Sequence, residues 1–271
     1  MGRSHHHPRA VKQPIGVFDS GVGGLSVWRE IVAQLPHEST VYVADQARLP
    51  YGPRPAAEVR AFAEAIATDL LERGCKAIVV ACNTASAAAL RSLRDRHPDV
   101  PFVGMEPAVK PAALNSKSRV VGVMATPGTL EGRMFADAVQ RFASGVKLVN
   151  QPCPGLVERI EHGDLDSPAT EALLRALVQP MLAAGADTIV LACTHYPFVL
   201  PLIRKIAGDG VQLIDPAAAV ARQLARVLDG HGLLAEPDGK ASHRFYTTGA
   251  PAALQAALPR LVGVEAKVEG L

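Results

Sequence analysis

Short runs of apolar and β-branched residues alternate along the chain with longer segments in which apolar residues recur every three or four positions. Residues 15–18, 41–44 and 77–82 are such runs, and the segments 25–34 and 56–73 between them have the helical spacing. Apolar runs of this length are typical of strands buried on both faces, and strands that alternate with helices form parallel sheets through right-handed crossovers. The pattern therefore predicts an α/β unit.

The same pattern starts again near residue 119. The segment 119–130 echoes the segment that starts at Ile15, and residues 185–193 repeat residues 74–82, each with a glycine eight positions before a final cysteine. We predict two copies of one α/β unit, with each cysteine delivered to the carboxyl end of a central strand. Further predicted elements are helices over 87–96, 131–142, 169–184 and 217–228 and strands over 102–105 and 146–149.

The predicted fold class is α/β with two pseudo-symmetric lobes, each a mostly parallel sheet flanked by helices, and with the active site in the cleft between them. The first lobe is predicted to comprise residues 13–107 and 217–271, because residues 245–249 read as a strand and turn that return the chain to it. The second lobe is predicted to be 108–216. Residues 1–12 are expected to be disordered or derived from a tag.

Composition excludes several classes of function. The 271 residues have a formal net charge of +2 without a dense run of Lys or Arg, so neither nucleic acid nor a membrane surface is expected as a partner. No apolar string approaches the roughly 20 residues that span a bilayer. Four cysteines without disulfide-framework spacing, and no evident leader, indicate free thiols and a cytoplasmic protein. The oligomeric state stays open, with a homodimer as one option.

Cys82 and Cys193 are expected on opposite walls of the cleft. Thiols on both sides of a ligand suit inversion at a carbon acid, where one base removes a proton from one face and a conjugate acid returns it to the other. Thiols have a pKa of about 8.5, which helix N-termini and nearby donors lower, and both cysteines are expected to precede a helix. The alternative is that both are small hydrophobic residues of the core.

Neighbouring residues extend this hypothesis. His195 could protonate or orient a thiol or the substrate, or could be an ordinary polar loop residue, and Asp19 could hold an ammonium group, position a proton or cap a helix. Gly21, Gly23 and Gly24 do not form the dinucleotide-binding pattern, and no lysine has an evident Schiff-base setting. Chemistry without a cofactor is therefore expected, and Cys75 and Cys153 are interpreted as core residues.

Four motifs, found in order over about 250 residues, together resemble those of the glutamate racemases. They are Asp19-Ser20-Gly-Val-Gly-Gly, Pro50-Tyr51-Gly52, Ala81-Cys82-Asn83-Thr84-Ala85-Ser86 and Cys193-Thr194-His195-Tyr196-Pro197.

The resemblance implies interconversion of L- and D-glutamate without a cofactor, which supplies D-glutamate for peptidoglycan, the cell wall and cell shape. It implies Cys82 and Cys193 as the acid/base pair, with Asp19, His195 and Glu161 assisting proton transfer. It also implies a set of substrate-contacting residues: Asp19, Ser20, Tyr51, Gly52, Asn83, Thr84, Thr126, Thr129, Thr194 and His195. No metal is implied.

Two positions depart from the family pattern. The Glu-His-Gly context of Glu161 differs from the usual two acidic residues before glycine, and Gln46 stands where a threonine is customary after Asp45. The first departure bears on the role assigned to Glu161, and the second bears on local hydrogen bonding of the loop rather than on the reaction.

Three alternatives stay open. The first is a racemase of the same superfamily that acts on aspartate or another amino acid. The second is a hydrolase that uses Cys193 with His195 and needs no Cys82. The third is a zinc-binding or amino-acid-binding module built on Cys82, Cys193 and His195, although a Cys-x-His spacing does not complete a tetrahedral set.

Overall fold

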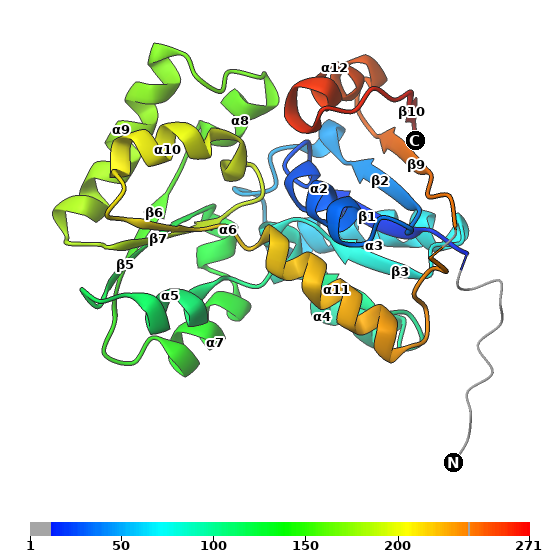
Figure 1. Ribbon diagram of the computed structural model, residues 1–271, viewed down its shortest axis with the longest axis horizontal. Helices are drawn as coiled ribbons and strands as arrows, with labels where there is room; N and C mark the ends of the chain where they lie inside the picture. The colour runs from blue at the N-terminus through cyan, green and yellow to red at the C-terminus, as the bar shows by residue number, and fades with distance from the viewer. Residues whose placement is uncertain (1–11, 238) are drawn as a thin grey trace.

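The computed structural model describes residues 12–237 and 239–271. It contains two separate sheets in which every strand pair is parallel, and helices flank both sheets, which confirms the predicted fold class (Figure 1). Residues 1–11, most of the N-terminal segment predicted to be disordered or tag-derived, lie outside the described residues.

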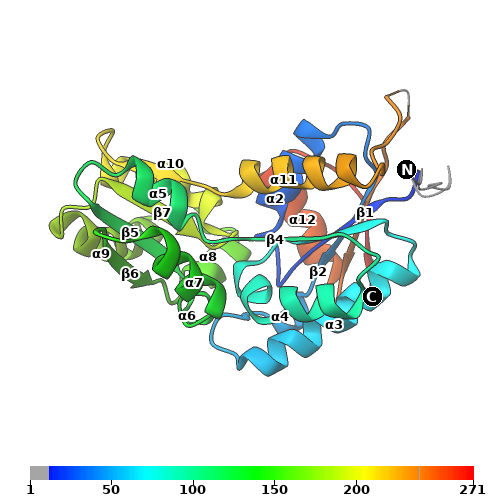
Figure 2. The same cartoon turned by 90° about the horizontal axis from the view of Figure 1, so that it is seen from below.

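The first lobe is built on a six-stranded sheet of order β10-β9-β2-β1-β3-β4. Helices α3 and α4 pack together on one face, and α2, α11 and α12 cover the other (Figure 2). The strands are β1 (Ile15–Asp19), β2 (Thr40–Ala44), β3 (Ala77–Val80), β4 (Phe102–Gly104), β9 (His243–Thr247) and β10 (Val268–Gly270). The helices are α2 (Leu25–Gln34), η1 (Gln46–Arg48), α3 (Ala56–Glu72), α4 (Asn83–Arg96), α11 (Ala217–Gly230) and α12 (Pro251–Val262).

The second lobe is built on a four-stranded sheet of order β6-β5-β7-β8. Helices α8, α9 and α10 lie on one side of it, and α5 and α7 lie on the other (Figure 1). The strands are β5 (Val120–Ala125), β6 (Lys147–Pro152), β7 (Thr188–Ala192) and β8 (Gln212–Ile214). The helices are α5 (Val109–Asn115), α6 (Pro127–Leu130), α7 (Arg133–Phe142), α8 (Leu156–Glu161), α9 (Pro168–Ala183), η2 (Tyr196–Val199) and α10 (Leu200–Ala207).

The two sheets repeat one topology. The neighbouring strands of the first sheet include the run β2-β1-β3-β4, and those of the second are β6-β5-β7-β8. If the strands of each lobe are numbered along the chain, both runs have the order second, first, third, fourth. Helix α5 packs on α7 of the second lobe, and α11 packs on α2 of the first. These contacts support the lobe boundaries that we propose, 13–107 with 217–271 and 108–216.

The repeated glycines have a conformational cause. Gly74 and Gly185 follow α3 and α9 with φ of +79° and +88°, a left-handed conformation that glycine adopts without strain. Each glycine N–H donates to the carbonyl three residues earlier, and the next N–H donates to the carbonyl five residues earlier. The same helix end therefore leads the chain into β3 and into β7 and sets both cysteines at equivalent positions.

Several predicted elements differ from the observed ones. The helix predicted over 131–142 begins two residues later, at Arg133, because Gly132 precedes α7 in an extended conformation, and the separate helix α6 before it was not predicted. Helices α5, α8, α10 and α12 were not predicted. Three of them are no longer than eight residues, which is too short for a clear apolar period.

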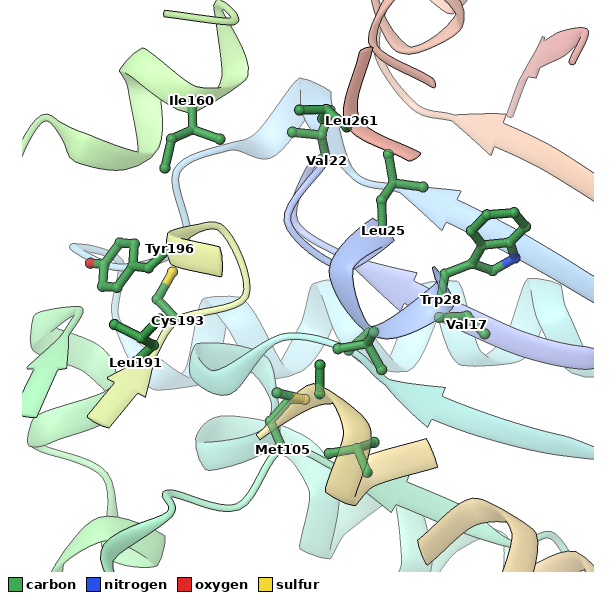
Figure 3. Close-up of a cluster of buried hydrophobic side chains, with 14 of the residues drawn as sticks. Val17, Val22, Leu25, Trp28, Met105, Ile160, Leu191, Cys193, Tyr196 and Leu261 are labelled. Atoms are coloured by element: carbon green, nitrogen blue, oxygen red, sulfur yellow. The ribbon is translucent and has the colours of Figure 1, made fainter. Parts of the chain in front are cut away.

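One apolar cluster joins the lobes. Figure 3 shows members of this cluster from both lobes, Val22 and Leu25 of the first and Ile160, Cys193 and Tyr196 of the second. This cluster removes water from the seam and ties the glycine-rich loop after β1 to the ends of α8 and β7.

Candidate active site

Both predicted thiols line one pocket at the carboxyl ends of the two sheets. Cys82 follows β3 and Cys193 follows β7, and the side chains are 5% and 7% exposed. The pocket is small, with a cavity of about 70 Å³, which suits a small molecule. Other predicted residues that line it are Ser20, Tyr51, Gly52, Asn83, Thr84, Thr126, Thr194 and His195.

Cys82 lies at the N-terminus of α4, as predicted. Its Sγ accepts a hydrogen bond from the Ala85 N–H at 3.4 Å and lies 4.0 Å from Ser20 Oγ. Burial raises the pKa of the Cys82 thiol well above its usual value and the negative charge of Asp19 raises it further, while the Ala85 N–H acts in the opposite direction. The expectation of a lowered pKa is therefore wrong for this cysteine, because desolvation outweighs one N–H donor.

Cys193 does not precede an α-helix, contrary to the prediction. A turn and the short 3₁₀ helix η2 follow it, so it has no helix N-terminus of the kind that Cys82 has. Its partner is a side chain instead, since His195 Nδ1 lies 3.8 Å from Sγ. The two equivalent cysteines therefore have different partners, a backbone N–H for Cys82 and a histidine side chain for Cys193.

Glu161 holds the other side of the His195 ring. Its Oε1 lies 2.6 Å from His195 Nε2 and also accepts the Val22 N–H at 2.7 Å. Burial disfavours a charged imidazole, but the hydrogen bonds to Cys193 and Glu161 outweigh it and raise the pKa of His195 well above its usual value. Burial likewise opposes ionisation of Glu161, yet the hydrogen bonds from His195, Val22 and Gln46 lower the pKa of that carboxyl. The arrangement favours an imidazolium between a carboxylate and a thiol.

Asp19 organises the loop after β1. Its Oδ2 accepts the Gly21 and Gly24 N–H groups at 3.0 Å each, and its Oδ1 accepts the Thr194 hydroxyl at 3.4 Å. Burial raises the pKa of Asp19, while the charge of His195 and the two N–H donors lower it. Asp19 is fully buried behind the pocket wall, where its charge acts on the Cys82 thiol.

Two glycines let the lobes approach each other. A Cβ on Gly21 would lie 1.9 Å from Glu161 Oε1, and a Cβ on Gly23 would lie 2.3 Å from His195 Nδ1. Any side chain at these positions would displace the carboxylate or the imidazole. The glycines of this loop therefore allow the two lobes to lie close together. No sequence pattern within one lobe reveals this role.

A line of hydroxyls crosses the pocket between the lobes. Thr84 Oγ1 lies 2.9 Å from Thr126 Oγ1, which lies 3.0 Å from Thr129 Oγ1. Thr84 and Thr126 line the pocket, whereas Thr129 is buried behind Thr126 and does not. Thr129 thus supports Thr126 in this structure, rather than reaching the pocket itself.

Tyr51 lines the pocket with its hydroxyl already engaged. That hydroxyl donates to Asp45 Oδ2, and Asp45 Oδ1 accepts the Thr248 hydroxyl at 2.7 Å. Burial and the charge of Asp45 raise the pKa of the Tyr51 phenol far above its usual value. Tyr51 can therefore shape the pocket but has no free proton to offer.

Cys153 is a pocket residue that sequence reasoning assigned to the core. It lines the pocket, and burial raises the pKa of its thiol to about 12. A signal was available, since Cys153 follows β6 as Asp45 follows β2, and these strands are equivalent in the two sheets.

Asn83 has a buried side chain whose amide nitrogen and oxygen both lack a hydrogen-bond partner. It is 4% exposed and lines the pocket. A buried amide without partners costs about 1–3 kcal/mol, so this side chain is set to bind a polar ligand.

We expect Asn83→Leu to bind substrate at least about tenfold more weakly while the folded state stays as stable or becomes more so, because the unpaired amide is removed. KM from initial rates and the free energy of unfolding in urea check the two parts. Asn115→Leu, at the exposed end of α5, is the control for a leucine substitution as such. An unchanged KM for Asn83→Leu would contradict a role in binding.

Within the described part of the chain, no three His, Cys, Asp or Glu side chains are grouped so that they could hold a metal ion. The same residues include no helix with both the length and the apolar character needed to cross a membrane.

The chain is similar to known racemases over nearly its whole length. The family model for Asp/Glu/Hydantoin racemase matches residues 15–224. Glutamate racemase from Ectopseudomonas mendocina is 54% identical over 255 residues, which cover 94% of this chain and 97% of that protein.

Solved structures agree with the sequence comparison. Glutamate racemase isoform RacE1 from Bacillus anthracis has a TM-score of 0.88 and 35% identity, with 96% of this chain and 97% of that chain covered. Glutamate racemase from Francisella tularensis in complex with D-glutamate has a TM-score of 0.84 and 30% identity, with 96% and 98% covered. These similarities confirm the resemblance that the four motifs indicate, and the chain belongs to the Asp/Glu/hydantoin racemase family.

Proposed function

We propose that the protein is a glutamate racemase, an isomerase that interconverts L- and D-glutamate without a cofactor. The observation that carries the proposal is the pair of thiols, Cys82 and Cys193, which reach one small pocket from equivalent strand ends. The curated relative at 54% identity and the similar structure that binds D-glutamate support glutamate as the substrate.

The reaction uses one thiol on each face of the substrate. A thiolate takes the α-proton, so that an S–H bond forms while the Cα–H bond breaks and the electron pair stays on Cα. The opposite thiol then gives its proton to the other face of Cα and becomes a thiolate. The raised pKa of Cys82 keeps it protonated as a donor, and the imidazolium of His195 stabilises negative charge on Cys193.

Neutral donors hold the substrate in this proposal. None of the described residues that line the pocket is Arg or Lys, so the Asn83 amide and the hydroxyls of Thr84, Thr126 and Thr194 bind the carboxylates. The α-proton of an amino acid is very weakly acidic, and a pocket that excludes water strengthens each of these dipoles as charge builds up on Cα. Ser20, Tyr51 and Gly52 complete the wall.

The product suits a biosynthetic role. We propose that the enzyme supplies D-glutamate for peptidoglycan, and so supports cell-wall biogenesis and cell shape, in the cytoplasm. Rescue of a bacterium that requires D-glutamate, with growth on medium lacking that amino acid, checks this role, and failure of an active, expressed enzyme to rescue growth would contradict it.

Incubation of L-glutamate with the protein in D₂O tests substrate and reaction together. We expect D-glutamate that carries deuterium at Cα, because the returning proton comes from a thiol that has exchanged with solvent. Circular dichroism measures the change of configuration, and proton NMR measures the loss of the α-proton. Aspartate is the matched alternative substrate. Faster turnover of aspartate, or D-glutamate without solvent deuterium, would contradict the proposal.

A further inference from the structure

Gln46 connects the two lobes at the edge of the candidate active site. It begins η1, one residue after the end of β2 of the first lobe, and its side chain reaches Glu161 at the end of α8 in the second. Gln46 Nε2 donates to Glu161 Oε2 at 3.1 Å. The other carboxylate oxygen, Oε1, bonds to Val22 and His195. Gln46 is therefore the residue that orients the second oxygen of Glu161.

The first lobe also fixes which way the Gln46 amide points. Thr247, the last residue of β9, donates its hydroxyl to Gln46 Oε1 at 3.0 Å and accepts the Gly249 N–H at 3.0 Å. Because the Thr247 hydroxyl donates to the amide oxygen, the amide nitrogen must face Glu161. A Cβ on Gly249 would lie 2.9 Å from Gln46 Cβ, so the absence of a side chain there makes room for this arrangement.

An uncharged donor suits this position. A carboxylate that accepts a hydrogen bond from an amide keeps its negative charge, and Glu161 needs that charge to hold His195 as an imidazolium. Gly249 donates to Thr247, Thr247 donates to Gln46 and Gln46 donates to Glu161, whose other carboxylate oxygen accepts the Nε2–H of His195. Each bond fixes the orientation of the next group, so the rotation of the Glu161 carboxylate is set from the first lobe.

We propose that Gln46 is a positioning residue for proton transfer at Cys193, because it sets the rotation of the Glu161 carboxylate and so keeps the His195 ring aimed at Cys193 Sγ. The inference rests on the proposed function and names a residue outside the pocket that acts through two others. Loss of Gln46 should affect proton transfer on the face of Cα that Cys193 serves and not on the face that Cys82 serves. A contact that merely held the lobes together would affect both faces alike.

The variant Gln46→Met retains the length of the side chain and removes both the oxygen and the nitrogen of its amide. We expect kcat to fall about tenfold, the loss expected for one hydrogen bond to a charged group. Gln46→Glu should lose more, and its loss should grow as pH rises and both facing carboxyls ionise. Thr247→Val, which frees the amide, should show a smaller loss in the same direction. Gln140→Met, on the exposed side of α7, is the matched control and should keep wild-type rates.

Isotope effects separate positioning from a structural role. With glutamate deuterated at Cα, we expect the isotope effect of Gln46→Met to rise for the enantiomer whose proton Cys193 removes and to fall for the other. Equal changes for both enantiomers, or none, would overturn the proposal. The Cys82→Ala variant identifies the enantiomer whose proton Cys193 removes, because this variant should still exchange the α-proton of that enantiomer with solvent.

A readout without turnover keeps this test separate from the proposed function. Nitrogen NMR of the His195 ring, assigned by its loss in His195→Asn, should show a weakened Nε2–H hydrogen bond in Gln46→Met. A ring spectrum equal to that of the wild type would overturn the role of Gln46. If the wild type does not racemise glutamate while the ring spectrum responds, the proposed function fails and the contact stands.

Discussion

Cys82→Ala and Cys193→Ala are each expected to lower racemisation of glutamate about 10³- to 10⁴-fold, within the range for loss of a positioned acid or base. Each thiol carries the proton for one face of Cα. The thiol that remains in a variant can therefore remove the α-proton, but no thiol can return a proton to the other face. Polarimetry measures racemisation, and α-proton exchange in D₂O measures the half-reaction. Each variant should still exchange the α-proton of a single enantiomer, which assigns each thiol to its substrate.

Cys75→Ala is the control for loss of a buried thiol outside the pocket. Cys75 packs in the core of the first lobe, where burial raises the pKa of its thiol to about 12, so its removal should leave turnover unchanged. Full activity in either Cys82→Ala or Cys193→Ala would rule out the two-base mechanism. The hydrolase alternative predicts activity without Cys82 and an acyl group on Cys193, which mass spectrometry of the trapped protein would detect.

Glu161→Gln is expected to lower kcat about 100-fold, within the range for loss of assistance to a general acid or base. Without the carboxylate, the buried His195 ring loses the negative charge that is hydrogen-bonded to it and its pKa falls, so the ring loses its proton within the assay range. Activity of the variant should decline as pH rises through neutrality, where the wild type keeps its imidazolium. Rates measured from pH 6 to 9 check the change of profile.

The same pair links stability to pH. The raised pKa of His195 in the folded protein means that its contribution to the free energy of unfolding is fully present below about 6.5, its unfolded pKa, and is lost as pH rises through the folded value. The lowered pKa of Glu161 acts oppositely, with a contribution present above about 4.3 and lost as pH falls through the folded value.

Urea unfolding across this range should therefore show a flatter pH dependence in Glu161→Gln than in the wild type. Glu265→Gln, at an exposed position after α12, serves as the control for loss of one carboxylate. A kcat and pH profile of Glu161→Gln equal to those of the wild type would show that the carboxylate does not assist Cys193.

Much of the architecture follows from local sequence. The buried run that becomes β3 is fully apolar and the run that becomes β7 is apolar after Thr188, and the glycines before them, Gly74 and Gly185, end helices in a conformation that favours glycine. These signals are contained within about ten residues, so the parallel strands and their repeated order can be predicted. The short helix α8 escapes prediction because it is stabilised by packing against α9 and η2 rather than by its own apolar period.

The sequence by itself determined the two-lobed α/β fold, the equivalence of Cys82 and Cys193, and the residue types that suit an amino acid. Only the tertiary structure decided which charged and hydrogen-bonding groups surround each thiol. Cys82 is buried near Asp19 at a helix N-terminus, whereas Cys193 faces an imidazole held by Glu161 and, through it, by Gln46 of the other lobe. Asp19, Glu161 and Gln46 each lie more than 30 residues along the chain from the group that they act on, and desolvation depends on everything packed around a group, so no local pattern encodes these contacts.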